Sequence, residues 1–176
     1  LEDINHNKFI DTTLGCGTHI LGHSPKVIND SIRNQLKKGV LYTTFNKHTY
    51  EVAELIQQCT PNVIDSVVFC NTGSEATMRA ARIARAYSNR KKIAIFSGSW
   101  HGGNELFVYD HDYSYSDYSA KHKSAGIPDE FKNSVIVLPY NHNDAFDLIR
   151  KNKHDIAMVI IEPSQGSNPR DDMLDF

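Results

Sequence analysis

The sequence predicts an α/β domain built around a mainly parallel β-sheet. Two observations support this prediction. Several short runs of residues are apolar throughout and rich in β-branched side chains, which is typical of strands buried on both faces. These runs alternate with stretches whose apolar residues recur at helical spacing, as in a parallel sheet flanked by helices. The predicted strands are residues 66–70, 92–96, 135–138 and 156–161.

The first third of the chain is predicted to be mostly helical. Residues 9–23 begin as a short strand-like segment and continue into a glycine-rich connection. A helix is expected next, with Ser24 as its N-cap and Gly39 as its stop. A second helix, capped by Thr49, is expected to end before Pro61.

The rest of the chain alternates between strands and helices, with one interruption. Residues 75–85, rich in Ala and Arg, are expected to form a helix after the first predicted strand, and residues 144–151 another between the last two. From Phe107 to Lys132 the apolar pattern gives way to Tyr, Ser, Asp, His and Lys, which predicts a long surface excursion.

Composition narrows the class of protein. With 176 residues, 40% hydrophobic and 23% charged, the chain is typical of one globular domain or of one large part of a bigger protein. Its 19 basic and 21 acidic residues leave a net charge of -2, which argues against a nucleic-acid-binding surface. No apolar run approaches the ~18 residues of a membrane span, and no signal peptide is recognisable. Cys16, Cys59 and Cys70 form no CxxC pair, which favours a reducing, cytoplasmic location without a disulfide framework or a structural zinc site.

Three loops contain the residues that could carry chemistry. The first is 71–76, between a predicted strand and a predicted helix, where Thr72, Gly73 and Ser74 would offer hydroxyls and unpaired helix amides to a phosphate. From these residues alone, a helix cap without any ligand is the favoured interpretation. The loop is neither a P-loop nor a dinucleotide-binding fingerprint, so a phosphate without a nucleotide is the simpler expectation.

The second and third loops also follow predicted strands. Trp100 and His101 lie in a glycine-rich segment, where a flat side chain can stack on a planar heteroaromatic ring. Core packing is the alternative for this tryptophan. Glu162 ends the last predicted strand, where a carboxylate is either a site residue or one partner of a structural ion pair.

Metal binding is not expected from the nine histidines. His19 and His23 are four residues apart, but on a glycine-rich connection and without an HExxH motif, so they are interpreted as non-ligands. A group of acidic and histidine residues between two predicted strands could bind a cation, although a solvated loop explains the composition as well. This group consists of Asp110, His111, Asp112 and Asp117.

Taken together and in this order, the loops resemble the class III pyridoxal-phosphate aminotransferases, most closely their glutamate-1-semialdehyde 2,1-aminomutase branch. The resemblance covers nearly the whole chain. It rests on residues 17–23, 71–85, 100–102, 138–141 and 161–163.

The resemblance implies a cofactor and a role for each loop. The fold would be part of the large domain of a fold-type I pyridoxal-phosphate transferase, with residues 1–60 as an N-terminal segment and 61–176 as a partial cofactor-binding domain. The turn Thr72–Gly73–Ser74 would hold the 5′-phosphate of pyridoxal 5′-phosphate, and Trp100 would stack on its pyridine ring. His101 would lie beside that ring, and Glu162 would lie on the cofactor and substrate side.

Two departures limit what the resemblance implies. The family's cofactor-binding lysine and the aspartate that pairs with the pyridine nitrogen normally follow the Glu-Pro strand end, and the sequence stops at Phe176 before either, so we expect a fragment and assign no catalytic residue. Cys16 stands where aminomutases carry a tryptophan, and Gly166–Ser167 replaces a Gly-Asn pair. The substrate is therefore left open.

The expected function is amino-group transfer between small-molecule amino donors and acceptors, by a transaminase or an aminomutase. By resemblance the intact protein would be a homodimer, with no nucleic-acid or membrane partner. The alternative is a non-catalytic relative that keeps the fold for binding or assembly.

Overall fold

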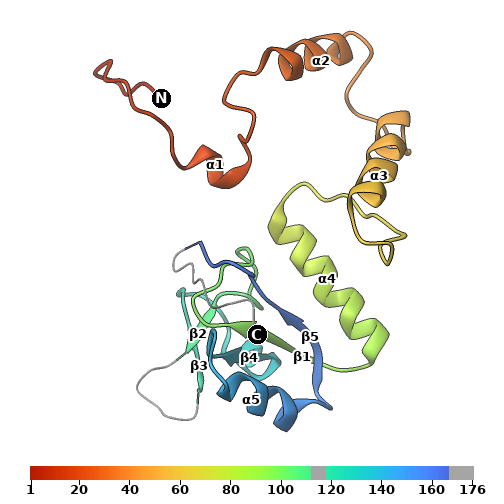
Figure 1. Cartoon of the computed structure of the whole chain (residues 1–176). Helices are drawn as coiled ribbons and strands as arrows, with labels where there is room; N and C mark the ends of the chain where they lie inside the picture. Colours follow the sequence, from red (N-terminus) through yellow and green to blue (C-terminus); the bar gives the residue numbers. More distant parts are fainter. Residues whose placement is uncertain (112–117, 167–176) are drawn as a thin grey trace. The chain divides into compact units, whose positions relative to one another are not determined.

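The computed structural model describes residues 1–111 and 118–166 and divides into two units, Leu1–Val67 and Val68–Phe176. The first unit contains three helices joined by loops (Figure 1). They are α1 (Leu14–Gly17), α2 (Lys26–Leu36) and α3 (Lys47–Cys59). This division follows the contacts within the chain, and the boundary at residue 60 stays a prediction.

Both long helices of the first unit are confirmed, but their N-caps differ from the predicted ones. The N-cap of α2 is Pro25, whose extended backbone ends where the helix begins, and not Ser24. The N-cap of α3 is Asn46, whose side chain accepts a hydrogen bond from the backbone N–H of Thr49 at 3.1 Å. A capping oxygen serves an amide two or three residues further on, so Thr49 is the capped residue and not the cap.

The short strand-like opening predicted at the start of residues 9–23 is wrong. A strand needs a hydrogen-bonded neighbour, and the described residues of the first unit contain only one isolated bridge, between Glu2 and Lys8. Gly15 and Cys16 adopt left-handed backbone angles inside the short α1, so this segment turns instead of extending.

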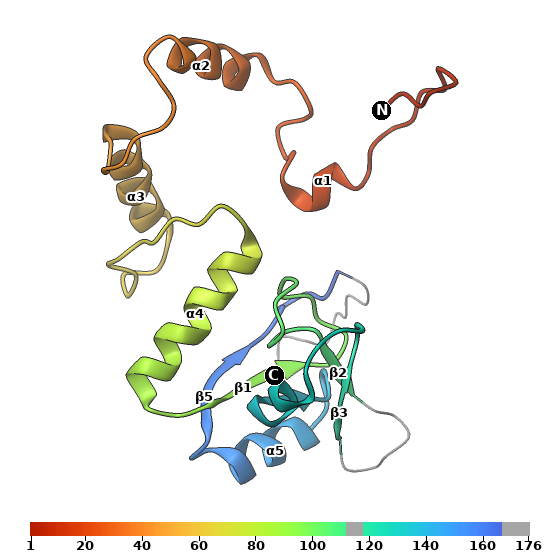
Figure 2. The same cartoon turned by 180° about the vertical axis from the view of Figure 1, so that it is seen from behind.

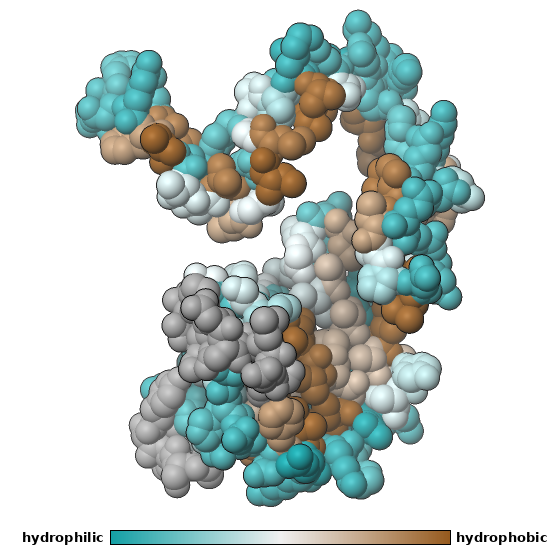
Figure 3. All heavy atoms as spheres, viewed as in Figure 1, coloured by the Kyte–Doolittle hydropathy of each residue, from teal (hydrophilic) through white to brown (hydrophobic). Residues whose placement is uncertain are grey.

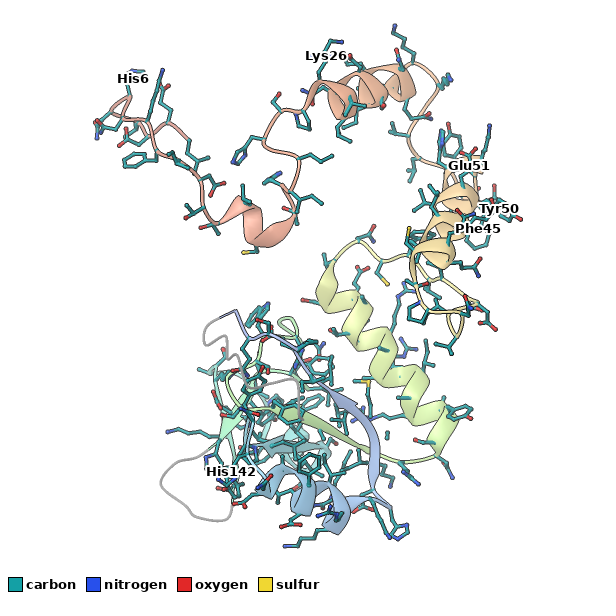
Figure 4. All side chains as sticks on the ribbon, viewed as in Figure 1. His6, Lys26, Phe45, Tyr50, Glu51 and His142 are labelled. Carbon is teal, nitrogen blue, oxygen red and sulfur yellow. The ribbon has the colours of Figure 1, made fainter. Side chains whose placement is uncertain are left out.

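The first unit has no buried residue among those that the structure describes. Figure 3 shows hydrophobic side chains at the surface of α2 and α3. Phe45 and Tyr50, at and within the start of α3, are 92% and 67% exposed (Figure 4). The apolar faces of these helices therefore form no hydrophobic core within their own unit.

The second unit is built on a three-stranded parallel sheet, as predicted. Its strands are β1 (Lys92–Phe96), β4 (Val135–Leu138) and β5 (Ile156–Ile160), in the order β4-β1-β5. The apolar runs identified in the sequence form these strands because both faces of the sheet are covered.

Each face of the sheet has its own hydrophobic core. Ile93 and Ile95 point to one side, where the helix α4 (Gly73–Ser88) packs through its buried Ala81. Ala94 and Phe96 point to the other side, where the helix α5 (Asp144–Asn152) packs. Opposite views of the molecule show these two helices beside the sheet (Figures 1 and 2). Both helices agree with the predicted ones, and the three layers fix the start of α4 against the strand ends.

The surface excursion predicted for residues 107–132 is wrong for much of its length. Within its described part, β2 (Tyr109–His111) and β3 (Ala120–His122) form an antiparallel pair, followed by a 3₁₀ helix, η1 (Asp129–Ser134). Phe107 and Tyr109 are fully buried in the core on the α4 side. Three-residue strands leave too short a run for the apolar alternation to stand out among polar neighbours.

The strand predicted for residues 66–70 is also absent. These residues belong to no helix or strand and have no strand neighbour in the described part of the chain. Val68 and Phe69 are 62% and 43% exposed. Among the described residues, no helix is long and apolar enough to cross a membrane.

We predict that Tyr109→Phe stabilises the protein by up to about 1 kcal/mol. The Tyr109 hydroxyl is buried and has no hydrogen-bond partner among the described residues, so its removal relieves a desolvation cost. Urea unfolding of the variant tests this, with Tyr87→Phe, at a 93% exposed position, as the control without effect. A clear loss of stability would show that the hydroxyl has a bonded partner.

Candidate active site

The site lies at one edge of the parallel sheet. Since parallel strands end at the same edge, the segments that follow β1, β4 and β5 meet there. The hydroxyl of Tyr140, after β4, donates to the backbone oxygens of Glu162 and Pro163, after β5, at 3.2 and 3.3 Å. The two outer strand ends are thereby tied together across β1.

The N-terminus of α4 is a tight, capped turn. Thr72 is the N-cap, and its hydroxyl accepts from the backbone N–H of Glu75 at 3.1 Å. The Glu75 carboxylate in turn accepts from the backbone N–H of Asn71 at 2.9 Å. The helix-cap interpretation of Thr72 is thus confirmed. The amides of Gly73 and Ser74, in the first turn, have no intrahelical acceptor and remain available for a ligand.

The turn at the start of α4 touches the loop after β1. The Ser74 hydroxyl accepts from the backbone N–H of Gly103 at 3.0 Å, and the Thr77 hydroxyl donates to the backbone oxygen of His101 at 2.7 Å. Gly102 has φ +99°, and a Cβ there would lie 2.6 Å from Ser74 Oγ. The backbones meet only because residue 102 has no side chain. Two of the three predicted loops are therefore adjacent.

Trp100 and His101 point into different environments. The Trp100 indole is 67% exposed, so core packing does not explain it. The His101 ring is 7% exposed and packs edge-on against Phe107, with a centroid separation of 5.9 Å. Burial lowers the pKa of His101, and the charge of Lys123 adds to this, while Glu162 opposes it. The lowered pKa favours the neutral ring, and its buried Nε2 has no hydrogen-bond partner in the described part of the chain.

Glu162 is half-buried at the carboxyl end of β5. Within residues 1–111 and 118–166 its carboxylate forms no ion pair, so the structural ion pair considered for it is not seen there. Its charge nevertheless acts on His101. Gln165, three residues after Glu162, donates to the backbone oxygen of Ser97, so the third predicted loop contacts the second. All six predicted site residues belong to the second unit.

These groups suit a planar ligand with an anionic substituent. The start of α4 offers two amides that have no intrahelical acceptor, together with the Ser74 hydroxyl. Outside its own helix and chain neighbours, no atom of the described residues lies within 4 Å of the position that a Cβ on Gly73 would take. The exposed Trp100 face is available for stacking, and His101 Nε2 is an unused polar atom. The residues present therefore fit a phosphorylated heteroaromatic group.

A polar network that contacts the loop after β1 was not predicted. The Asp110 carboxylate accepts from the Ser97 hydroxyl and from the backbone N–H of His111, and it lies 3.5 Å from Lys123 Nζ. Burial pushes the pKa of Asp110 upward, but these hydrogen bonds and the charge of Lys123 outweigh burial and hold the pKa below its usual value. Asp110 is therefore engaged as a structural carboxylate.

We predict that Asp110→Asn lowers the free energy of unfolding at neutral pH by about 1 to 3 kcal/mol. The free energy of unfolding of this variant should also fall less steeply as the pH is lowered. Because the folded pKa is depressed, the ionised Asp110 stabilises the fold above the pKa of the unfolded chain, and this contribution is lost as pH falls through the folded pKa. Chemical unfolding from pH 7 to about pH 3 measures it. Equal acid dependence in Asp110→Asn, the natural chain and the control Glu105→Gln would contradict it.

Other candidate ligands are engaged elsewhere. His23 Nε2 contacts the Asp11 carboxylate at 2.7 Å, and the rings of His19 and His23 contact each other in a tilted arrangement with centroids 4.7 Å apart. The considered cation site can be followed only at Asp110 and His111, since Asp112 and Asp117 lie outside the described residues. In the residues that are described, no cluster of three or more His, Cys, Asp or Glu side chains is arranged to hold a metal.

The fold and the site define an α/β protein in which one edge of the sheet carries groups that would suit a flat, anionic ligand. The chain matches the class III aminotransferase family over residues 1–168, and it belongs to that family. A glutamate-1-semialdehyde 2,1-aminomutase from Saccharolobus islandicus is 39% identical over 93% of this chain and 38% of its own length. The resemblance stated from the sequence is thereby confirmed.

Solved structures agree with the fold. An omega-transaminase from Sphaerobacter thermophilus matches with a TM-score of 0.85 and 29% identity, over 93% of this chain and 39% of its own. A transaminase with PLP bound matches with a TM-score of 0.86 and 25% identity, over 99% and 42%. The chain therefore spans about two fifths of the length of its relatives, and the α/β fold of a transaminase-type large domain is confirmed for the part present.

Proposed function

We propose that the complete protein containing this chain is a pyridoxal-phosphate-dependent enzyme that transfers amino groups between small molecules. The observation that carries the proposal is the contact between Ser74, at the start of α4, and Gly102–Gly103, next to Trp100. It brings an anion-binding turn and an exposed aromatic face to one place. The relatives named above, aminomutase and transaminases, support this reading.

Different residues of this chain would bind the phosphate and the ring of the cofactor. The amides of Gly73 and Ser74 and the Ser74 hydroxyl bind the phosphate, and Thr72 keeps the helix start in shape by capping it. Trp100 stacks on the ring. When bound, pyridoxal phosphate supplies an electron sink for negative charge at the carbon that bears the amino group.

His101 and Glu162 would act at the side of the ring. Burial lowers the pKa of His101 and favours its neutral form, so it would offer a hydrogen bond without adding positive charge beside the ring. The Glu162 carboxylate acts on His101 and could attract a positively charged amino substrate to the same side of the ring. We further propose a cytoplasmic homodimer for the complete protein, on the strength of the family resemblance and of the cysteine usage.

The test is cofactor binding and turnover by the complete protein. We expect stoichiometric pyridoxal phosphate after gel filtration, a visible absorption band, and conversion of an amino substrate. A need for a separate amino acceptor indicates a transaminase, and turnover without one indicates an aminomutase. Bound cofactor without any turnover would favour the non-catalytic relative, and a protein that binds no cofactor would overturn the proposal.

A further inference from the structure

Gln165 is a buried side chain that the proposed chemistry does not use. It follows Glu162 by three residues and is 3% exposed. Its Nε2 donates to the backbone oxygen of Ser97 at 2.8 Å and to the Ser99 hydroxyl at 2.9 Å. Both acceptors are buried and lie in the loop that follows β1. Both N–H groups of this amide are therefore satisfied by one short stretch of backbone and side chain.

The two acceptors flank a tight turn just before Trp100. Gly98, between them, has φ +80°, and a Cβ there would lie 3.3 Å from Gln165 Oε1. The carboxamide thus packs flat against the turn and bonds to both of its sides. A longer or shorter side chain at position 165 could not keep both hydrogen bonds.

Charged residues also hold the same turn. Ser97 donates its hydroxyl to Asp110, and Lys123 Nζ donates to the backbone oxygen of Ser99 at 3.0 Å. Lys123 also pairs with Asp110 at 3.5 Å. Together, the side chains of Gln165, Asp110 and Lys123 hold the residues on both sides of Gly98. Three separate segments contribute to these contacts, namely the loop after β1, the β2–β3 pair and the loop after β5.

We propose that Gln165 is a positioning residue that holds the Trp100–His101 loop in place for the cofactor ring, with Asp110 and Lys123 bracing the same turn. The proposal rests on the proposed function, because it assumes that this loop receives the ring. Gln165 also couples the two sides of the site, since Glu162 and Gln165 belong to one loop and Trp100 follows directly on the other. Without the amide, the loop would sample orientations in which the indole no longer faces the ligand.

The complete protein tests this with Gln165→Met and Gln165→Glu. Met keeps a similar volume and removes both donors, while Glu keeps the shape and replaces the donor by a carboxylate. In the cofactor-free protein, the amides of residues 97–103 should exchange with deuterium about tenfold faster than in the natural protein. The dissociation constant of pyridoxal phosphate, followed by absorbance, should rise about tenfold in both variants.

Two readouts separate positioning from general weakening. The binding defect of Gln165→Glu should shrink as pH falls, because a protonated carboxyl regains one donor, whereas the defect of Gln165→Met should not. Asn133→Asp, an amide-to-acid change at an exposed position, should alter neither exchange nor affinity. The amides of α5 serve as an internal reference, and equal acceleration there would count against the proposal.

The outcomes distinguish the two proposals. If the natural protein binds pyridoxal phosphate and the variants match it in exchange and affinity, the role of Gln165 is overturned and the proposed function stands. If the natural protein binds no cofactor, the proposed function fails. The exchange rates of residues 97–103 then still decide whether Gln165 holds the loop.

Discussion

Gly102→Ala is expected to reduce the affinity for pyridoxal phosphate at least about a hundredfold, which corresponds to roughly 3 kcal/mol. A Cβ at this position would lie 2.6 Å from Ser74 Oγ and 2.8 Å from Ser74 Cα, and the second atom belongs to the helix backbone and cannot swing away. The backbone angle φ of +99° is also unfavourable for alanine. The loop and the start of α4 must therefore separate.

The separation would break the contact that joins the two halves of the site. The hydrogen bond from the Gly103 amide to Ser74 is lost, so the phosphate-binding turn and Trp100 no longer face one ligand. Gly103→Ala is a matched control, because apart from its chain neighbours no described residue lies within 4 Å of its added Cβ, and we expect nearly natural affinity. Titration of both complete variants with pyridoxal phosphate measures the difference. Equal affinities would refute the assigned geometry.

The strands of the sheet could be predicted from the sequence because their burial leaves a direct trace. A strand covered on both faces is apolar at every position, so the segments 92–96, 135–138 and 156–161 stand out from their surroundings. The predicted strand 66–70 shows the limit of this argument. The same apolar pattern occurs there, but a strand also needs a neighbour to pair with, and no sequence pattern shows whether one is present.

The site could be predicted in parts but not in its connections. Thr72, Trp100 and Glu162 were found because each stands at the end of an apolar run, where loops of α/β proteins bind ligands. The contact between Ser74 and Gly103 joins residues 29 positions apart and depends on how α4 packs on the sheet. Its one sequence signal was Gly102, whose purpose becomes clear only with Ser74 beside it.

Gln165 and Lys123 were missed for a related reason. Lys123 lies in the predicted surface excursion, and Gln165 lies in a candidate loop in which only Glu162 was singled out. A buried polar side chain looks the same in a sequence as an exposed one. Their partners are mainly backbone oxygens, which every residue has, so residue type alone gives no hint of pairing. Burial of the segment had to be known first.

Phe107→Ala is expected to lower the free energy of unfolding by about 3 to 5 kcal/mol. The ring is 1% exposed and lies in the hydrophobic core on the α4 side of the sheet, although the surrounding sequence looks like surface loop. Its removal leaves a cavity that a packed sheet cannot close without distortion. The loss would be a large fraction of the stability of a typical domain.

The same substitution also removes a wall of the candidate site. His101 packs edge-on against Phe107, so its ring gains freedom and its partly dehydrated position beside Glu162 is lost. Cofactor affinity should therefore fall together with stability, whereas Tyr87→Ala, at a 93% exposed position on α4, should change both little. Urea unfolding and cofactor titration of the complete variants measure the two effects. A loss of less than about 1 kcal/mol in Phe107→Ala would mean that residues 107–111 do not belong to the core, and the surface-loop interpretation of the sequence would then be right.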